Sequence, residues 1–175
     1  MSRCMRIITG CVVAVAVSAA AATLTADDGV RTVQIRDDCD PATFNADPPA
    51  GPGLGVICGG DGDTTFGDFI AELQATQTAE KWRFNPTSTD DTRLMARNRG
   101  GETHTFTPVA NFGGGIIPGL NALSGNPVEA PECADGAKFG ASVVPPGTSS
   151  KTITAKAGDR FQCCIHPWMR TTVTK

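Results

Sequence analysis

The stretch Phe161-Gln-Cys-Cys-Ile-His-Pro-Trp-Met-Arg170 contains three metal-binding side chains at a constant spacing of three residues. They are Cys163, His166 and Met169, which offer a thiolate, an imidazole and a thioether. With a second imidazole they complete the two-histidine, one-cysteine set with a weak axial methionine that favours blue copper. The chain holds only 2 histidines, so that imidazole must come from His104. The predicted metal ligands are therefore His104, Cys163, His166 and Met169.

Two other interpretations of this stretch remain open. Adjacent cysteines near a histidine also occur in structural zinc sites, but such sites close with four nitrogen or sulfur ligands and do not normally recruit methionine. In a metal-free interpretation, Cys163 and Cys164 form disulfides, as exported cysteines usually do, and both histidines are ordinary residues. The Met169 thioether favours copper over both the zinc site and the metal-free interpretation.

The order Cys-x-x-His-Pro-aromatic-Met-Arg resembles the copper loop of cupredoxins, most of all those of the amicyanin and plastocyanin type. Asn98, six residues before His104, and a β-rich pattern extend the resemblance over residues 82–175. The resemblance implies one type 1 copper ion with His104, Cys163 and His166 as strong ligands and Met169 as the long axial one.

The sequence departs from the plastocyanin pattern directly after the first histidine ligand. Proteins of that type commonly carry an asparagine there, which ties the two ligand segments together by hydrogen bonds, whereas this chain has Thr105. A threonine hydroxyl both donates and accepts hydrogen bonds. We therefore expect Thr105 to do part of the same work.

The first 26 residues have the form of a secretory signal peptide. A basic start precedes an apolar run over residues 7–22, as in the first two regions of such signals. Cleavage is expected after Ala26, with Ala22 as the alternative. An uncleaved membrane anchor is less favoured, because the run is shorter than the roughly 20 residues of a spanning helix. We expect a periplasmic or secreted protein with no membrane span in the mature chain.

Charge divides the mature chain into two parts. Residues 27–80 carry eleven acids against Arg31 and Arg36, whereas residues 81–175 carry eleven bases against seven acids. The acidic part either steers a protein partner electrostatically or is only a solvated surface. Nucleic acid is not an expected partner, since the bases form no cluster. The predicted division is a signal at 1–26, an acidic arm with a disulfide loop and a helix at 27–81, and a copper domain at 82–175.

The cysteine count also suggests an oxidising compartment. Five cysteines remain after cleavage, and assigning Cys163 to the metal leaves four, an even number for disulfides. Residues 37–63 are rich in Asp, Pro and Gly and bury too little apolar surface to order themselves. A bridge from Cys39 to Cys58 is the natural restraint for that segment.

Strand geometry separates the two adjacent cysteines. Side chains alternate across a strand, so Cys163 shares the inner face with Phe161, while Cys164 lies on the opposite face. In an oxidising compartment Cys164 then needs a partner. Cys133, within the long loop at 111–138, is the cysteine that remains. We therefore predict a second disulfide between Cys133 and Cys164.

The arm and the copper domain differ in their hydrophobic period. In the arm we predict an edge strand at 31–36 and one helix at 65–80, which starts with a capping box formed by Thr65 and Asp68. From residue 82 the period is two, with strands predicted at 82–85, 93–98, 103–109, 139–144, 151–155, 160–164 and 170–174. The predicted fold class is all-β: a cupredoxin-like Greek-key β-sandwich with one N-terminal helix and a long loop insertion.

These patterns predict a small monomeric electron carrier that cycles between Cu(I) and Cu(II) and is not itself an enzyme. Trp168 is expected beside an exposed edge of His166, where a redox partner protein would dock, since aromatic residues are enriched at interfaces. An indole packed inward is the alternative, because Trp is highly buried on average. The main alternative is a protein that buffers or delivers copper. An oxidase is excluded within one chain, because it would need further copper ions held by many histidines. A copper-free interaction module is the remaining possibility.

Overall fold

A computed structural model describes residues 29–55 and 57–175 of the chain. The predicted signal peptide at 1–26 lies outside these residues. A search of the described ranges for a helix with the length and apolar character of a membrane span finds none.

The strands of the described residues form three sheets. Their orders are β2-β1-β4-β8, β3-β10-β9-β6 and β5-β7. The bounds are β1 (Arg31–Arg36), β2 (Arg83–Asn85), β3 (Ser88–Thr89), β4 (Arg93–Asn98), β5 (His104–Thr105), β6 (Thr107–Val109), β7 (Val143–Val144), β8 (Ile153–Thr154), β9 (Arg160–Gln162) and β10 (Arg170–Val173).

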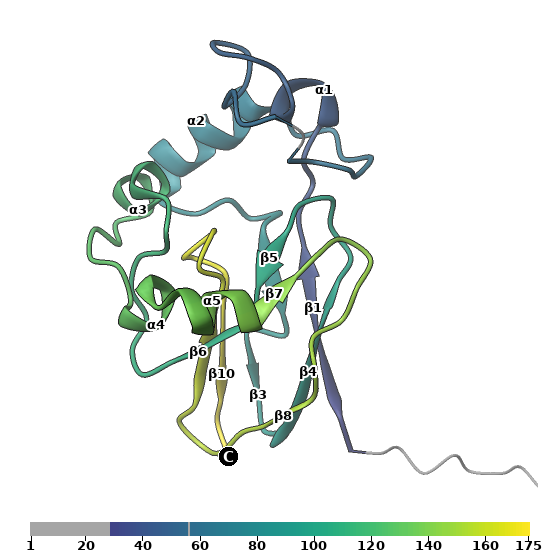
Figure 1. The fold of residues 1–175 in the computed structure, drawn as a ribbon, viewed down its shortest axis with the longest axis vertical. Helices are drawn as coiled ribbons and strands as arrows, with labels where there is room; N and C mark the ends of the chain where they lie inside the picture. The colour runs from purple at the N-terminus through teal and green to yellow at the C-terminus, as the bar shows by residue number, and fades with distance from the viewer. Residues whose placement is uncertain (1–28, 56) are drawn as a thin grey trace, which may run out of the picture.

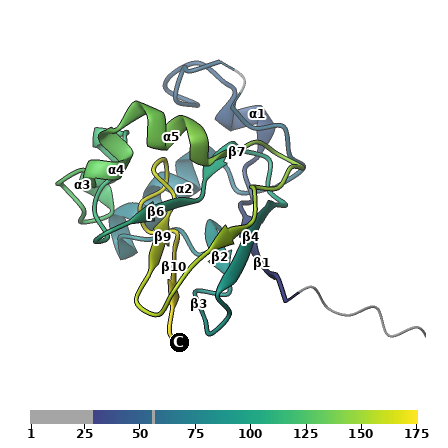
Figure 2. The same ribbon diagram turned by 60° about the horizontal axis from the view of Figure 1, so that its bottom comes forward.

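Five short helices accompany these sheets in the described part of the chain. They are α1 (Pro41–Phe44), α2 (Phe66–Thr76), α3 (Pro118–Leu123), α4 (Pro131–Ala134) and α5 (Gly136–Ser142). In Figure 1, α1 and α2 lie together at one end of the molecule, and α3, α4 and α5 lie along one side. Figure 2 shows α5 close to β7 and α4 near β6.

The expectation of an all-β Greek-key sandwich with a single N-terminal helix is wrong. Both four-stranded sheets are mixed, because β1 pairs with β4 in parallel and β3 pairs with β10 in parallel. A separate two-stranded sheet and five helices complete the described fold. The strand signals at 93–98, 160–164 and 170–174 correspond to β4, β9 and β10, but the architecture built from them is mixed α and β.

The predicted strand at 139–144 is mostly helix, and the predicted long loop contains α3 and α4. Asp135 caps α5, since its carboxylate accepts hydrogen bonds from the backbone N–H groups of Ala137 and Lys138. An N-cap of this kind satisfies donors that a helix start otherwise leaves free. Only Val143 and Val144 continue as strand. The helix cap at Asp135 therefore outweighs the weak alternation of apolar and polar residues from which the strand at 139–144 was predicted.

Strand β1 lies inside its sheet rather than at an edge. It is antiparallel to β2 on one side and parallel to β4 on the other. Val33 and Ile35 point into the core and are fully buried. The first sheet thus contains strands from both sides of residue 82, and the arm packs as part of the main core.

Helix α2 begins as predicted and ends earlier. The Thr65 hydroxyl accepts a hydrogen bond from the Asp68 backbone N–H at 3.1 Å, which is the first half of the capping box. The helix ends at Thr76, because Gln77 adopts the left-handed conformation with φ of 61°. Its apolar stripe buries Phe69 and Leu73 in the core.

Both predicted disulfides are present. Cys39 bonds to Cys58, and Cys133 bonds to Cys164. Cys163 remains free and buried. It belongs to the main core, whereas Cys164 lies in a second cluster beneath α4 and α5. The two cysteines therefore face opposite sides, as strand alternation predicts, but the short helices also bury the outer one.

Replacing both Cys133 and Cys164 by Ser is expected to lower the free energy of unfolding by about 2 to 4 kcal/mol. The bridge spans a sequence separation of 31 residues, so its loss gives the unfolded chain more freedom. Urea unfolding of the double variant and the parent, followed by circular dichroism, measures the change. An unchanged midpoint would contradict this prediction.

Candidate metal centre

Two separate strand ends carry the three ligands that the structure brings together. His104 is the first residue of β5, whose backbone pairs with β7. Cys163 directly follows β9, and His166 lies in the turn that leads to β10. All three side chains are buried. The centre thus forms where the short β5-β7 sheet meets the turn between β9 and β10.

Backbone hydrogen bonds close that turn. The N–H of Cys163 donates to the Met169 carbonyl at 3.0 Å, and the N–H of Met169 donates to the His166 carbonyl at 2.9 Å. The Arg170 guanidinium donates to the Pro167 carbonyl at 2.7 Å. Met169 is fully buried in the same core cluster as Cys163. Its role as the axial ligand remains a prediction.

The three ligand atoms form a compact triangle. His104 Nδ1 lies 3.2 Å from His166 Nδ1 and 3.7 Å from Cys163 Sγ. The distance from Cys163 Sγ to His166 Nδ1 is 3.9 Å. Bonds of about 2.0 to 2.3 Å from a central ion, spread evenly in a plane, would hold such atoms roughly 3.5 to 3.8 Å apart. His104, Cys163 and His166 therefore fit a bound metal ion.

Fixed donors hold the Cys163 sulfur in place. The backbone N–H groups of Thr105 and His166 both donate to it, at 3.4 and 3.5 Å. The Thr105 hydroxyl in turn accepts the backbone N–H of Cys164 at 2.7 Å. Thr105 thus ties the two ligand segments together, which confirms the role expected for it.

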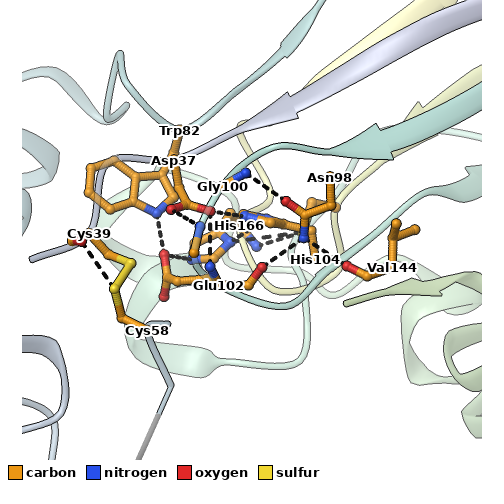
Figure 3. Close-up of polar contacts among 12 residues, drawn as sticks. Asp37, Cys39, Cys58, Trp82, Asn98, Gly100, Glu102, His104, Val144 and His166 are labelled. Atoms are coloured by element: carbon orange, nitrogen blue, oxygen red, sulfur yellow. Dashed lines mark hydrogen bonds and ion pairs between the residues drawn. A yellow bond between two sulfur atoms is a disulfide. The ribbon is translucent and has the colours of Figure 1, made fainter. Parts of the chain in front are cut away.

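Asp37 orients the first histidine. Its Oδ2 lies 2.7 Å from His104 Nε2, and its two oxygens also accept the backbone N–H groups of Gly101 and Glu102. Figure 3 shows this carboxylate against the imidazole. A partner on Nε2 fixes the tautomer and leaves the Nδ1 lone pair for a metal.

Glu102 occupies the corresponding place at the second histidine. Its Oε2 lies 3.7 Å from His166 Nε2 and also accepts a hydrogen bond from the indole N–H of Trp82. Glu102 is 6% exposed. Each imidazole therefore has a buried carboxyl group on its Nε2 side, while both Nδ1 atoms face the sulfur.

Asn98 supports the segment that carries His104. Its side-chain amide donates to the carbonyls of Glu102 and Val144 at 2.8 and 2.9 Å, and its oxygen accepts the Gly100 N–H (Figure 3). Asn98 is the last residue of β4. It joins that strand to the residues on both sides of the β5-β7 pairing, which fixes the position of His104.

The pKa shifts at the centre favour a thiolate at Cys163 beside a protonated imidazole at His104. Burial alone would lower the pKa of His104, but hydrogen bonds to Asp37 and Cys163 raise it to about 10. Burial alone would raise the pKa of Cys163, yet contacts with His104 and His166 bring it well below its usual value. A positive charge already stabilises this thiolate, and a metal ion can take the place of that charge.

The carboxyl groups respond differently to burial. For Asp37, burial favours a higher pKa, but the hydrogen bond and charge of His104 outweigh burial and lower it. For Glu102, burial dominates and the pKa is raised, although His166, His104 and Trp82 oppose this. Asp37 is therefore the stronger anionic neighbour of the site.

Helix α2 covers the second histidine, against the expectation of an exposed edge. His166 is 2% exposed, and its ring lies edge-on to those of Phe69 and Trp168, with centroids 6.3 and 5.4 Å apart. Trp168 is half-buried and also contacts Phe69. Trp168 therefore lies beside His166 as expected, while Phe69 of the arm shields the imidazole.

Sequence reasoning missed Asp37 and Glu102. Asp37 lies at the start of a segment predicted as plain loop, 67 residues before His104. Glu102 stands two residues before His104 in sequence, but its carboxyl group lies beside His166 instead. No local pattern links either acid to an imidazole, because both contacts form only when distant segments fold together.

Comparisons with protein-family models, with curated proteins and with solved structures find no match for this chain.

Replacing Asp37 by Asn is expected to weaken metal binding by about 10- to 100-fold, because the imidazole loses its charged partner. Competition with a chelator of known affinity measures the change. Asp38→Asn is the matched control, since Asp38 pairs with Lys81 and Thr64 instead. Equal affinities of the two variants would contradict the role assigned to Asp37.

Metal binding near neutral pH is expected to release about one proton. With a pKa of about 10, His104 stays protonated until the pH approaches that value, whereas the lowered pKa leaves Cys163 without a proton. Apparent affinity should therefore rise with pH through the neutral range. Calorimetric titration in buffers of different ionisation enthalpy counts the protons, and a heat that does not depend on the buffer would contradict the expectation.

Proposed function

We propose that this protein is an exported electron carrier that holds one type 1 copper ion and cycles it between Cu(I) and Cu(II). The observation that carries the proposal is the buried triangle of His104 Nδ1, Cys163 Sγ and His166 Nδ1. Two imidazoles and a thiolate with a thioether nearby in sequence favour copper of this type. Two disulfides agree with an oxidising location such as the periplasm or the exterior.

Rigid support of the ligands favours electron transfer. A copper ion supplies the one-electron chemistry, and a ligand set that need not rearrange keeps the barrier to each transfer low. The chain provides that rigidity through the N–H groups of Thr105 and His166 on the sulfur and through Asp37 on His104. These supports come from the backbone or from buried side chains, so they persist in both redox states.

Burial of the ligands argues against copper delivery. A delivery protein hands its ion to a partner by ligand exchange, which requires accessible donor atoms. His104, Cys163 and His166 are each at most 2% exposed, and residues 27–175 contain only two methionines, Met95 and Met169. Tight enclosure suits an ion that stays bound while electrons pass.

A redox partner protein is proposed to approach through Trp168. This residue is half-buried and its ring meets that of His166. A half-exposed indole offers an apolar contact of the kind enriched at protein interfaces. We further propose that the carrier acts as a monomer and has no nucleic-acid partner.

Cu(II) is expected to give the purified protein an intense thiolate-to-copper absorption band that a mild reductant bleaches reversibly. Cys163→Ser should abolish the band, while Cys164→Ser should keep it, because Cys164 bonds to Cys133 instead. Met169→Leu should keep the colour and raise the reduction potential, since a weak axial donor chiefly tunes the site. Visible absorption and redox titration measure these properties.

Several results would overturn the assignment. A colourless protein that prefers zinc, or copper bound without reversible reduction, contradicts the electron-carrier function. Loss of colour in Cys164→Ser with retention in Cys163→Ser reverses the ligand assignment. Loss of all copper in Met169→Leu shows that the methionine is not a weak axial ligand.

A further inference from the structure

An apolar pocket of about 390 Å³ adjoins the metal centre. It lies between the arm and the loop before α3, and its lining includes Phe66, Phe69, Ile116, Leu120, Glu102 and His166. Sites for small molecules are commonly apolar hollows of about 300 to 1,000 Å³ with few polar groups. The size and character of this pocket suit one small organic molecule.

Aromatic rings dominate the arm's side of the pocket. Phe44, Phe66 and Phe69 all line it, and the Phe44 ring lies edge-on to that of Phe66 at 5.4 Å and tilted against that of Phe69 at 5.5 Å. Rings in such edge-on and tilted arrangements favour a further aromatic ring packed among them. The pocket therefore matches a flat aromatic body better than a long alkyl chain.

Glu102 in the pocket wall has a carboxyl oxygen that the protein leaves available. Glu102 uses Oε2 for Trp82 and His166, while no hydrogen bond to its Oε1 is found among residues 29–55 and 57–175. Figure 3 shows this second oxygen turned away from Trp82. This oxygen can therefore accept a hydrogen bond from a ligand in the pocket.

We propose that this pocket binds a small phenol, whose ring packs against Phe66 and Phe69 and whose hydroxyl donates to Glu102. A carboxyl acceptor selects a ligand that can donate a hydrogen bond. The volume is too small for a folded partner. The bound phenol contacts His166, one of the three metal-binding residues.

The acidic arm gains a role from this assignment. Phe44, Phe66 and Phe69 all belong to it, so the segment between the first strand and residue 81 forms the wall of a ligand site over the second histidine. This inference goes beyond electron transfer and does not depend on which metal the centre holds.

The test uses 4-ethylphenol and its methyl ether, 4-ethylanisole, which keeps the ring but cannot donate a hydrogen bond. Each is titrated into the full chain, both metal-free and zinc-loaded, with amide chemical shifts followed by nuclear magnetic resonance. We expect saturable binding of the phenol, at least about tenfold tighter than that of the ether. Because neither sample contains copper, the result does not depend on whether the copper assignment is correct.

A matched pair of variants locates the site. Ile116 lines the pocket and is 42% exposed, whereas Val128 is 76% exposed and lies outside the lining. Ile116→Trp should fill the mouth of the pocket and abolish phenol binding, while Val128→Trp should leave it unchanged. Undetectable binding of the phenol by the parent, equal affinity for the ether, or unchanged binding in Ile116→Trp would each overturn the proposal.

Discussion

The hydrogen bond between Asp37 and His104 is the contact on which the metal centre depends. Asp37 follows β1 directly, and β1 is held between two neighbouring strands, so the position of this carboxylate is set by the first sheet. Through it the first sheet orients an imidazole that lies on the separate β5-β7 pair. An imidazole buried without such a partner would have no fixed tautomer, and its Nδ1 would not be reserved for a metal.

Much of the ligand set was predictable from residues 161–170, because ligand spacing within a tight turn is a local property. The assignment of Cys163 to the centre and Cys164 to a disulfide followed from strand alternation, which is also local. Asp37 and Glu102 were not predictable in the same way. Their partners lie on other segments, and an acid beside a strand or a histidine has many possible roles until the fold brings the groups together.

The errors in the predicted fold also arise from contacts between segments that are distant in the sequence. Strands β4, β9 and β10 carry strong alternation and were found, whereas α4 and α5 are short and depend on a Pro start and on the cap at Asp135. A parallel pairing such as that of β1 with β4 leaves no mark in either strand taken alone. The sheet arrangement therefore could not be predicted from strand signals, and the resemblance of residues 161–170 to a cupredoxin loop did not extend to the whole architecture.

The charges around the centre bear on the state that its ion prefers. A thiolate at Cys163 and a carboxylate at Asp37 both lie in the interior, where opposite charges attract more strongly than in water. If the centre holds copper as proposed, these groups would stabilise Cu(II) more than Cu(I). Glu102 adds to that effect only while ionised, and its raised pKa limits this contribution. The arm that buries the centre therefore acts on it in two ways: Phe69 removes water from His166, and Asp37 supplies negative charge that would favour the more highly charged state of a bound metal ion.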